Sequence, residues 1–309
     1  MISIVIPLYN KEAHIRQTLQ SVLEQTFREF EIIIVNDGST DNSINEINKI
    51  EDERIRIIHQ ENQGVSPARN RGIKEARHEY IAFLDADDEW VPEYLDTMVK
   101  LIDEFPACSI FGAAYEIKGK NGKKINAIIN NLPFEGDTGM IDNYFEVASC
   151  SHPPLFPSNV IVRTKAFEVA NDFPSNVKSG EDLLTLAGLA IHFKIAYTTK
   201  ILVTYHFDMD EFNSNPRKID PNDIVGETMI GFLKSHPDIP YLKKYIGIWY
   251  RNRTSTLLRY ASWTKVWKEG IKSLKYNPTD IRIPVYGVIS LLPVKQRLKF
   301  FRFSSSSTS

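Results

Sequence analysis

Few cysteines and no long hydrophobic run occur in this 309-residue chain, and each absence excludes a class of protein. Cys108 and Cys150 form no C-x-x-C pair and no zinc-ligand cluster, which indicates a reducing compartment rather than a disulfide-stabilised secreted fold. The longest late apolar stretch, residues 285–294, is half of the roughly 20 residues that span a bilayer. The apolar start, residues 2–6, is too short for a signal peptide. We therefore expect a cytoplasmic protein.

The chain also lacks the glycine patterns that hold phosphates in many nucleotide-binding proteins. No two of its 15 glycines stand in G-x-G spacing, which excludes the dinucleotide fingerprint, and no P-loop is present. These absences argue against a nicotinamide dehydrogenase, an ATPase and a sugar-nucleotide pyrophosphorylase. A phosphate-containing ligand would then be held mainly by a metal ion.

Charge is distributed unevenly along the chain, although the net charge is only −2. Residues 1–240 hold 23 Lys and Arg against 37 Asp and Glu, whereas residues 241–309 hold 14 against 2. The positive segment predicts contact with an anionic surface. No nucleic-acid partner is expected, because the acidic part would oppose it and no reader motif occurs.

Strands and helices alternate through the first 110 residues, which is typical of an α/β fold with a doubly wound, mostly parallel sheet. Helical spacing of apolar residues marks the segments between the strands, and Pro92 predicts the start of a helix that ends near residue 105. Short apolar runs predict four strands, at residues 2–6, 30–35, 55–58 and 80–84.

The pattern changes twice further along the chain. It loosens between residues 119 and 155, and from residue 223 onward it is helical. We predict a catalytic domain over residues 1–220, divided into a nucleotide-binding half (1–110) and an acceptor half (111–220). A helical extension (221–303) and a disordered tail (304–309) would follow.

Polar residues gather where the predicted strands end, which is where ligands bind in open parallel sheets. Asp37 follows the second strand, and Asp85, Asp87 and Asp88 follow the fourth. Three carboxylates within four residues repel one another, and Mg²⁺ or Mn²⁺ would relieve that repulsion. The alternative, helix capping by Asp88, accounts for one aspartate but not for three. We therefore favour a metal site.

Several ordered motifs give the chain a resemblance to the family 2 glycosyltransferases, which have the GT-A fold. They are SIVIPLYN at 3–10, VNDGSTD at 35–41, NQGVSPARNRG at 62–72 and FLDADD at 83–88, with an acidic pair at Glu181 and Asp182. Their shared order and spacing make the resemblance more specific than any one motif. It implies an inverting enzyme that moves a sugar from a nucleotide-sugar, of the UDP type, to a hydroxyl group in polysaccharide or glycolipid synthesis.

The resemblance also assigns residues to the donor nucleotide. Pro7 and Tyr9 would line the base pocket, Asp37 would contact the uracil, Arg69 would lie on the nucleotide side, and Asp85 would lie near the ribose or the metal. Each has a simpler alternative. Asp37 can form an Asx turn with the residues after it, Tyr9 can cover the rim of the sheet, and Arg69 can be a surface helix residue.

The remaining roles concern the metal and the transfer step. Asp87 would hold Mn²⁺ or Mg²⁺ on the diphosphate. Asp182 would be the general base, because a carboxylate beside another one can acquire a pKa suited to proton transfer. Glu181 would contact the acceptor or hold the loop, and the alternative for this pair is stabilisation of a helix N-terminus. His206 matches a late metal-binding histidine of some GT-A enzymes, although a structural role is favoured.

The last helical segment, residues 281–303, contains five Lys or Arg residues and no acidic residue. Its large apolar residues include Ile289, Leu291, Leu292, Leu298, Phe300, Phe301 and Phe303. Such a segment can lie on an anionic membrane, at its inner face, and serve a lipid-linked acceptor. The alternative is a C-terminal helix packed on the catalytic domain, and Pro284 and Pro293 interrupt any single long helix. Both interpretations remain open.

Two other functions compete with sugar transfer. A nucleotidyltransferase would use a similar fold, but the early glycine-rich loop of that class is missing. A nucleotide-sugar-binding module without turnover is the second alternative, and the presence of Asp37, Asp87 and Asp182 argues against it.

Overall fold

A computed structural model describes residues 1–207 and 218–303, with side chains described up to residue 300. The chain divides into two compact units, Met1–Phe207 and Asp208–Ser309. The predicted boundary at residue 220 and the two predicted halves before it stay predictions. The tail predicted over residues 304–309 lies outside the described residues.

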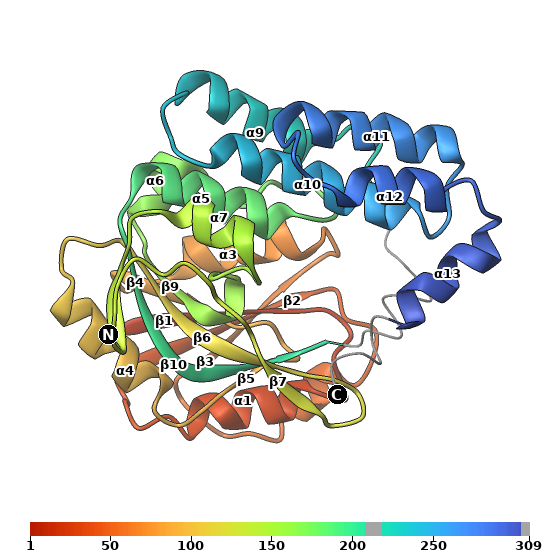
Figure 1. Ribbon diagram of the computed structural model, residues 1–309. Coiled ribbons are helices and arrows are strands. Elements are labelled where there is room, and N and C mark those ends of the chain that lie inside the picture. The colour runs from red at the N-terminus through yellow and green to blue at the C-terminus, as the bar shows by residue number, and fades with distance from the viewer. Residues whose placement is uncertain (208–217, 304–309) are drawn as a thin grey trace. The chain divides into compact units, whose positions relative to one another are not determined.

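A ten-stranded sheet forms the centre of the first unit, with the main order β3-β2-β1-β4-β9-β6-β10-β5 (Figure 1). Its first half is parallel and consists of the four predicted strands, β1 (Ile2–Leu8), β2 (Phe30–Asp37), β3 (Ile55–Gln60) and β4 (Tyr80–Phe83). Strands β1 and β2 are buried throughout, as their continuous apolar runs predict for a sheet covered on both faces.

The second half of the sheet is mixed. β9 (Val160–Arg163) runs antiparallel between β4 and β6 (Ile110–Lys118), and β6 pairs in parallel with β10 (Ile195–His206). Two short strands, β7 (Lys124–Asn126) and β8 (Thr138–Ile141), pair with β6 and β10. The α/β class is confirmed. The sheet was predicted to be mostly parallel, and it is mixed as a whole because the parallel order of its first half gives way to antiparallel pairs in the second.

Helices cover both faces of this sheet (Figure 1). On one face lie α1 (Ile15–Leu23) and α4 (Tyr94–Glu104), with α2 (Ser43–Ile47) packed on α1. On the other lie α3 (Val65–Glu75), α6 (Ala166–Ala170) and α7 (Glu181–His192). The helix α5 (Tyr144–Cys150) follows β8, and the short 3-10 helix η1 (Pro157–Asn159) precedes β9. The strand alternation of β1 divides its side chains between the two layers.

The segment after β4 differs from the prediction. The helix expected to begin at Pro92 begins at Tyr94, and before it the chain forms β5 (Glu89–Trp90), which pairs antiparallel with β10. Asp88 therefore does not cap a helix. A two-residue strand carries too little apolar pattern to be recognised in the sequence.

The second unit is helical where it is described, which confirms the predicted C-terminal helices. Its helices are α9 (Ile224–Ser235), α10 (Leu242–Leu257), α11 (Trp263–Tyr276), α12 (Arg282–Ile289) and α13 (Val294–Phe303). Arg253 of α10 lies buried between two carboxylates, with Nε 2.7 Å from Glu269 and Nη1 3.3 Å from Asp223. Within the described residues, no helix is both long enough and apolar enough to cross a membrane.

Candidate active site

The loops that follow β1 and β2 are joined by hydrogen bonds at the carboxyl edge of the sheet. The Asn10 N–H donates to Ser39 Oγ at 3.1 Å, and the Thr40 N–H donates to Asn10 Oδ1 at 2.8 Å. Asn10 has a positive φ of 50°, which turns the chain sharply after the strand. Pro7 lies buried inside β1, and Tyr9 lies exposed just beyond it. Tyr9 is therefore placed at the rim, as a base-stacking residue would be.

Asp37 is the buried last residue of β2, and it organises the start of α3. Its Oδ1 accepts hydrogen bonds from Gln60 Nε2 at 2.7 Å and from the Gln63 N–H at 2.9 Å, and its Oδ2 accepts the Gly64 N–H at 2.7 Å. The Ser39 N–H, which an Asx turn of Asp37 would use, donates instead to Asn36 Oδ1 at 3.0 Å. Asp37 thus links the second strand to the loop at residues 62–64.

The acidic cluster after β4 is compensated by the protein itself. Asp85 Oδ1 lies 2.7 Å from Nη2 of Arg69, and Asp87 forms an ion pair with Lys11. Asp88 is fully buried and accepts hydrogen bonds from Ser158 Oγ at 2.5 Å and from the His206 N–H. Charge repulsion therefore does not by itself require a metal here, because the protein supplies cations beside two of the three carboxylates.

Burial also shifts the pKa of one carboxyl group in this cluster, that of Asp88. Burial, together with the charges of Asp85 and Asp87, raises the pKa of Asp88 well above its ordinary value. Ser158 supports the same turn from the other side, because its Oγ accepts the Asp85 N–H at 3.1 Å. Asp88 and Ser158 therefore hold the turn that presents Asp85 and Asp87.

Arg69 joins this turn to the acidic pair of α7. Its guanidinium is buried, and its Nη1 lies 3.5 Å from Glu181 Oε1 while Nη2 contacts Asp85. Its charged group also lies 5.1 Å from the ring centroid of Phe173, a cation–π distance. Although burial alone would lower the pKa of Arg69, the charge and hydrogen bond of Asp85 raise it, so the group stays positive. The surface-residue alternative for Arg69 is thereby excluded.

The acidic pair opens α7, after Gly180 in a left-handed conformation. Burial, and then the charge of Asp182, raises the pKa of Glu181, while Arg69 opposes the change. Asp182 is half-buried, and its Oδ1 accepts the Leu183 N–H at 2.7 Å. The two carboxylates thus have different surroundings, with Glu181 held by Arg69 and Asp182 nearer to solvent.

His206 ends β10 beside the acidic turn. Its Nε2 lies 2.7 Å from Glu89 Oε1, and its N–H donates to Asp88 Oδ1 at 2.9 Å. Burial lowers the pKa of His206 despite the nearby Glu89 charge, so the imidazole is neutral near pH 7. These contacts show a structural role for His206 at the end of β10, and its role as a metal ligand stays a prediction.

Two residues of this site were not singled out from the sequence. Lys11 directly follows the predicted site motif at 3–10, so a basic residue there was a usable signal. Ser158 is separated by 70 residues from Asp88 and carries no motif, so only the fold could identify it. The structure brings Arg69, Asp85 and Glu181 into direct contact, whereas Asp37 bonds to a separate loop.

The first part of the chain matches the model of a known protein family. Residues 3–163, more than half of the chain, match the model "Glycosyl transferase family 2". The chain belongs to the family 2 glycosyltransferases. The resemblance stated from the motifs is therefore confirmed.

Curated relatives of this glycosyltransferase align over its first part. GlyA of Streptococcus pneumoniae serotype 4 is 34% identical over 212 residues, which are 66% of this chain and 30% of GlyA. An uncharacterized glycosyltransferase of Rickettsia bellii is 37% identical over 184 residues, which are 59% of this chain and 25% of the relative. The chain thus matches only about a quarter to a third of the length of these relatives.

Solved structures show the same fold over nearly the whole chain. The crystal structure of Staphylococcus aureus TarS 1-349 in complex with UDP has a TM-score of 0.67 at 19% identity, covering 98% of this chain and 91% of that one. The complex of the same TarS fragment with UDP-GlcNAc has a TM-score of 0.64 at 21% identity, covering 97% and 87%. The GT-A fold of this glycosyltransferase is therefore established.

A divalent ion at this rim would not find a cage of protein ligands among the described residues. In residues 1–207 and 218–303, no group of three or more His, Cys, Asp or Glu side chains is placed to hold a metal. Mg²⁺ usually keeps several waters and binds one or two carboxylates together with substrate phosphates. Asp87, which is part-exposed, fits an ion of that kind. The metal itself stays a prediction.

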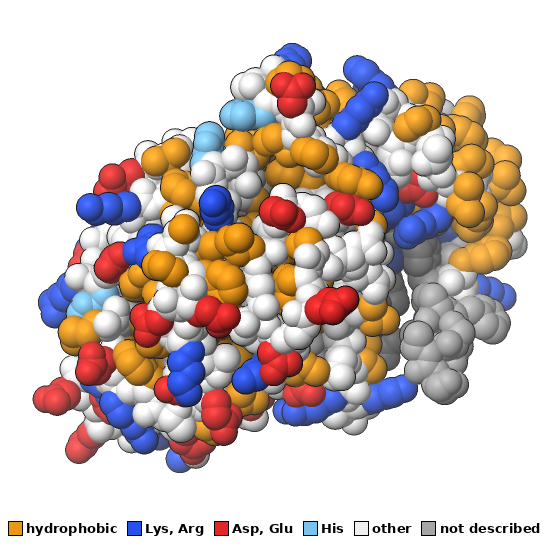
Figure 2. All heavy atoms as spheres, turned by 60° about the vertical axis from the view of Figure 1, so that its left-hand side comes forward, with side chains coloured by type: hydrophobic (Ala, Val, Ile, Leu, Met, Phe, Trp, Pro, Cys, Tyr) orange, Lys and Arg blue, Asp and Glu red, His pale blue; other side chains and the backbone are white. Residues whose placement is uncertain are grey.

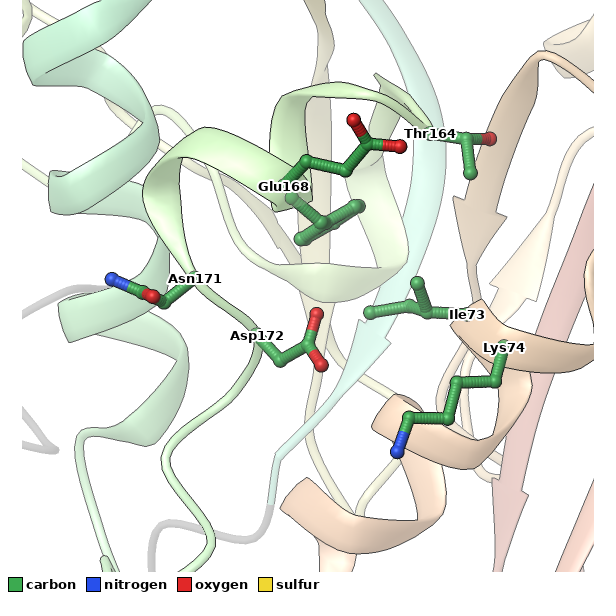
Figure 3. A pocket seen from close by; sticks show the side chains of 7 residues that line it. Ile73, Lys74, Thr164, Glu168, Asn171 and Asp172 are labelled. Carbon is green, nitrogen blue, oxygen red and sulfur yellow. The ribbon is translucent and has the colours of Figure 1, made fainter.

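One described hollow lies away from these residues (Figure 3). It has a volume of about 390 Å³ and lies at the C-terminal end of α3, whereas Asp37 contacts the N-terminal end. It contains none of the predicted site residues. Its lining is formed by Ile73, Lys74, Thr164, Phe167, Glu168, Asn171 and Asp172.

Proposed function

We propose that this family 2 glycosyltransferase moves a sugar from a UDP-sugar to a hydroxyl group of a saccharide or lipid-linked acceptor, with inversion at the anomeric carbon. The observation that carries the proposal is the buried Arg69, which joins Asp85 of the donor motif to Glu181 of the acidic pair. This contact brings donor-side and acceptor-side carboxylates together. UDP and UDP-GlcNAc in the TarS complexes support the choice of donor.

In this proposal the first two strands supply the nucleotide site. The exposed Tyr9 stacks on the base, with the buried Pro7 shaping the wall behind it. Asp37 fixes the loop at residues 62–64 and presents a carboxylate edge to the uracil. These residues bind and orient the donor, and Asp85 faces its ribose.

The acceptor proton is taken by Asp182. Glu181 is buried and held by Arg69, so its oxygens are less accessible to an acceptor than those of Asp182, and we assign it a positioning role. Asp182 Oδ1 accepts the Leu183 N–H, and its Oδ2 is the atom that we assign to the proton. The acceptor oxygen then attacks the anomeric carbon in one displacement, and no covalent sugar–enzyme intermediate forms.

Asp87 would hold Mn²⁺ or Mg²⁺, and the ion would supply Lewis-acid stabilisation of the charge on the departing diphosphate. In the structure Asp87 pairs with Lys11, and this contact holds the carboxylate at the rim. We place the enzyme in the cytoplasm, at the inner face of a membrane.

The proposal is tested by UDP release from UDP-sugars with Mn²⁺ and a panel of acceptors. Asp182→Asn removes the base and should lower turnover by about 10²- to 10⁴-fold while UDP binding is retained. Asp87→Ala and removal of the metal with EDTA should each lower turnover as well. Tight UDP binding by the wild-type protein with no turnover of any donor would instead support a binding module. Pyrophosphate release would support a nucleotidyltransferase.

A further inference from the structure

The helix α12 (Arg282–Ile289) is buried on one side, and its opposite side is exposed. One side is buried and carries Ile283, Gly287 and Ser290, at the spacing of one helix face. This side packs closely on α11, because a Cβ at Gly287 would lie only 2.2 Å from Trp267. Packing on α11 therefore accounts for the buried side of the helix and not for the apolar residues on its exposed side.

The opposite side of α12, together with one residue before the helix and one just after it, is exposed and apolar. Ile281, Val285, Val288 and Leu291 have exposed fractions between 54% and 81%. With 100° per residue, the first three of them lie within about 60° of one another and face away from Ile283. A helix that packs on one side ordinarily presents polar residues on the other. We call these four residues the α12 stripe.

The accessible charge around the stripe is positive. Between residues 241 and 300 there are two acidic side chains, Glu269 and Asp280, and both are buried in ion pairs. Lys295 and Lys299 are exposed on α13. Figure 2 shows hydrophobic side chains gathered at the right-hand margin of the molecule, with lysine or arginine side chains beside them. This segment therefore presents apolar and cationic groups to its surroundings.

One cation of the segment has an internal role. The buried guanidinium of Arg297 donates to the backbone oxygens of Leu292 and Ala261, at 2.6 Å and 2.7 Å, and to that of Ser290. It ties α13 to the end of α12 and is not available to a partner. Between residues 281 and 300, the cations that remain for a partner are the exposed Lys295, Lys299 and Arg282.

We propose that the α12 stripe inserts into the interface of an anionic membrane, with Lys295 and Lys299 contacting the lipid headgroups. Apolar side chains on an interfacial helix provide binding through buried area, and basic residues near the surface add attraction to anionic lipids. A second copy of the chain fits this surface less well, because its like charges would face one another. The proposal does not depend on sugar transfer, since it concerns the helical unit alone.

The test compares two single substitutions of exposed β-branched residues in the same unit. Val288→Glu places a charge in the stripe, and the matched control Ile271→Glu places it on α11, at a similarly exposed position (61% against 68%). Binding to vesicles is measured by co-sedimentation, with phosphatidylcholine alone or mixed with phosphatidylglycerol. Circular dichroism checks that each variant is folded.

We expect the wild-type protein to bind the anionic vesicles, and Val288→Glu to weaken that binding about tenfold or more, because a charge is costly in the apolar interface. Ile271→Glu should change vesicle binding less than about twofold, because Ile271 lies outside the α12 stripe. Lys295→Glu with Lys299→Glu should weaken binding and reduce its dependence on salt.

Three outcomes would overturn the proposal. They are absence of wild-type binding to anionic vesicles, equal loss in Val288→Glu and Ile271→Glu, and a dimer in sedimentation velocity that Val288→Glu dissociates. Because vesicle binding is measured without donor or acceptor, its failure is distinguishable from failure of the proposed transferase activity.

Discussion

Arg69 contacts both acidic groups of the site, Asp85 after β4 and Glu181 at the start of α7. Its planar guanidinium reaches Asp85 with one nitrogen and Glu181 with another, while its stem lies buried in α3. A fork of this kind fixes both carboxylates in orientation, which a point charge cannot do. The residue therefore positions the site and has no need to touch the substrate.

Replacing Arg69 by lysine should show whether the positive charge alone is enough or whether the planar guanidinium is needed to hold both carboxylates. Lysine keeps the charge but cannot hold both carboxylates, so we expect kcat to fall by about 10- to 100-fold through misplacement of Asp182 and its neighbour. The affinity for UDP should change much less. Steady-state kinetics and UDP titration measure the two quantities. The control is Arg71→Lys, on the exposed side of the same helix, where kcat should be unchanged. Equal losses in both variants would contradict this role.

Asp37 has a structural role in addition to the nucleotide contact that its motif predicts, because it accepts hydrogen bonds from the loop at residues 62–64. In Asp37→Asn one accepting oxygen becomes an NH₂ group that faces the N–H groups of Gln63 or Gly64. We expect the free energy of unfolding to fall by about 1–3 kcal/mol, because a buried donor loses its acceptor, and UDP binding to weaken as well. Urea unfolding and calorimetric titration measure both.

The matched control for Asp37→Asn is the same substitution at Asp96, which forms an exposed pair with Lys100 on α4. Its effect on stability should stay below about 0.5 kcal/mol. If Asp37→Asn were as mild as Asp96→Asn, the loop contacts seen here would have no energetic weight.

At the scale of elements, α3 packs directly on β1 and β2 of the sheet. Gly72 allows that approach, because a Cβ on it would lie 2.1 Å from Cγ1 of Val5 in β1. The same helix carries Arg69 on its buried side and meets Asp37 at its N-terminus. The distance between α3 and the sheet therefore sets the position of two site residues at once.

Gly72→Ala should overpack this contact and lower the free energy of unfolding by about 1–3 kcal/mol. Thermal or urea unfolding measures it, and adding Val5→Ala should recover part of the loss by making room. The control is Gly231→Ala in α9, where no atom lies within 4 Å of the new Cβ. There we expect a gain of about 0.5–1 kcal/mol from helix propensity. A stabilising Gly72→Ala would show that the close approach is not real.

At the scale of the whole molecule, the chain forms two compact units, and the predicted site residues all come from the first. The second unit has its own buried ion-pair network, in which Arg253 contacts Asp223 and Glu269 and donates to the Asp220 carbonyl oxygen. Stability of this unit and nucleotide binding should therefore be separable.

Arg253→Met tests this separation. It leaves two buried carboxylates without their main partner and should cost about 3–5 kcal/mol, measured by urea unfolding followed in the helical signal. UDP affinity at a concentration of urea where both units are folded should be unchanged. Lys272→Met removes a more exposed cation from the same two carboxylates and should cost less than about 1 kcal/mol. Loss of UDP binding in Arg253→Met would show that the units are coupled.

The amino-acid sequence alone determined the first four strands, the acidic pair at the start of α7 and the helical C-terminal part. These features depend on local apolar periodicity and on motifs whose residues are close in the chain. The sequence also determined the family, because its motifs keep a fixed order. It identified Asp85, Asp87 and Asp88 as one cluster but misjudged what compensates their charge.

Only the tertiary structure decided the partners of that cluster. Arg69, Lys11 and Ser158 lie 16, 76 and 70 residues from the aspartates that they contact. No local pattern encodes such pairs, because they arise where separate loops meet at one edge of the sheet. The same holds for the α12 stripe, whose apolar residues are ordinary in sequence. They indicate a binding surface only because the structure shows that the opposite face of the helix packs on α11.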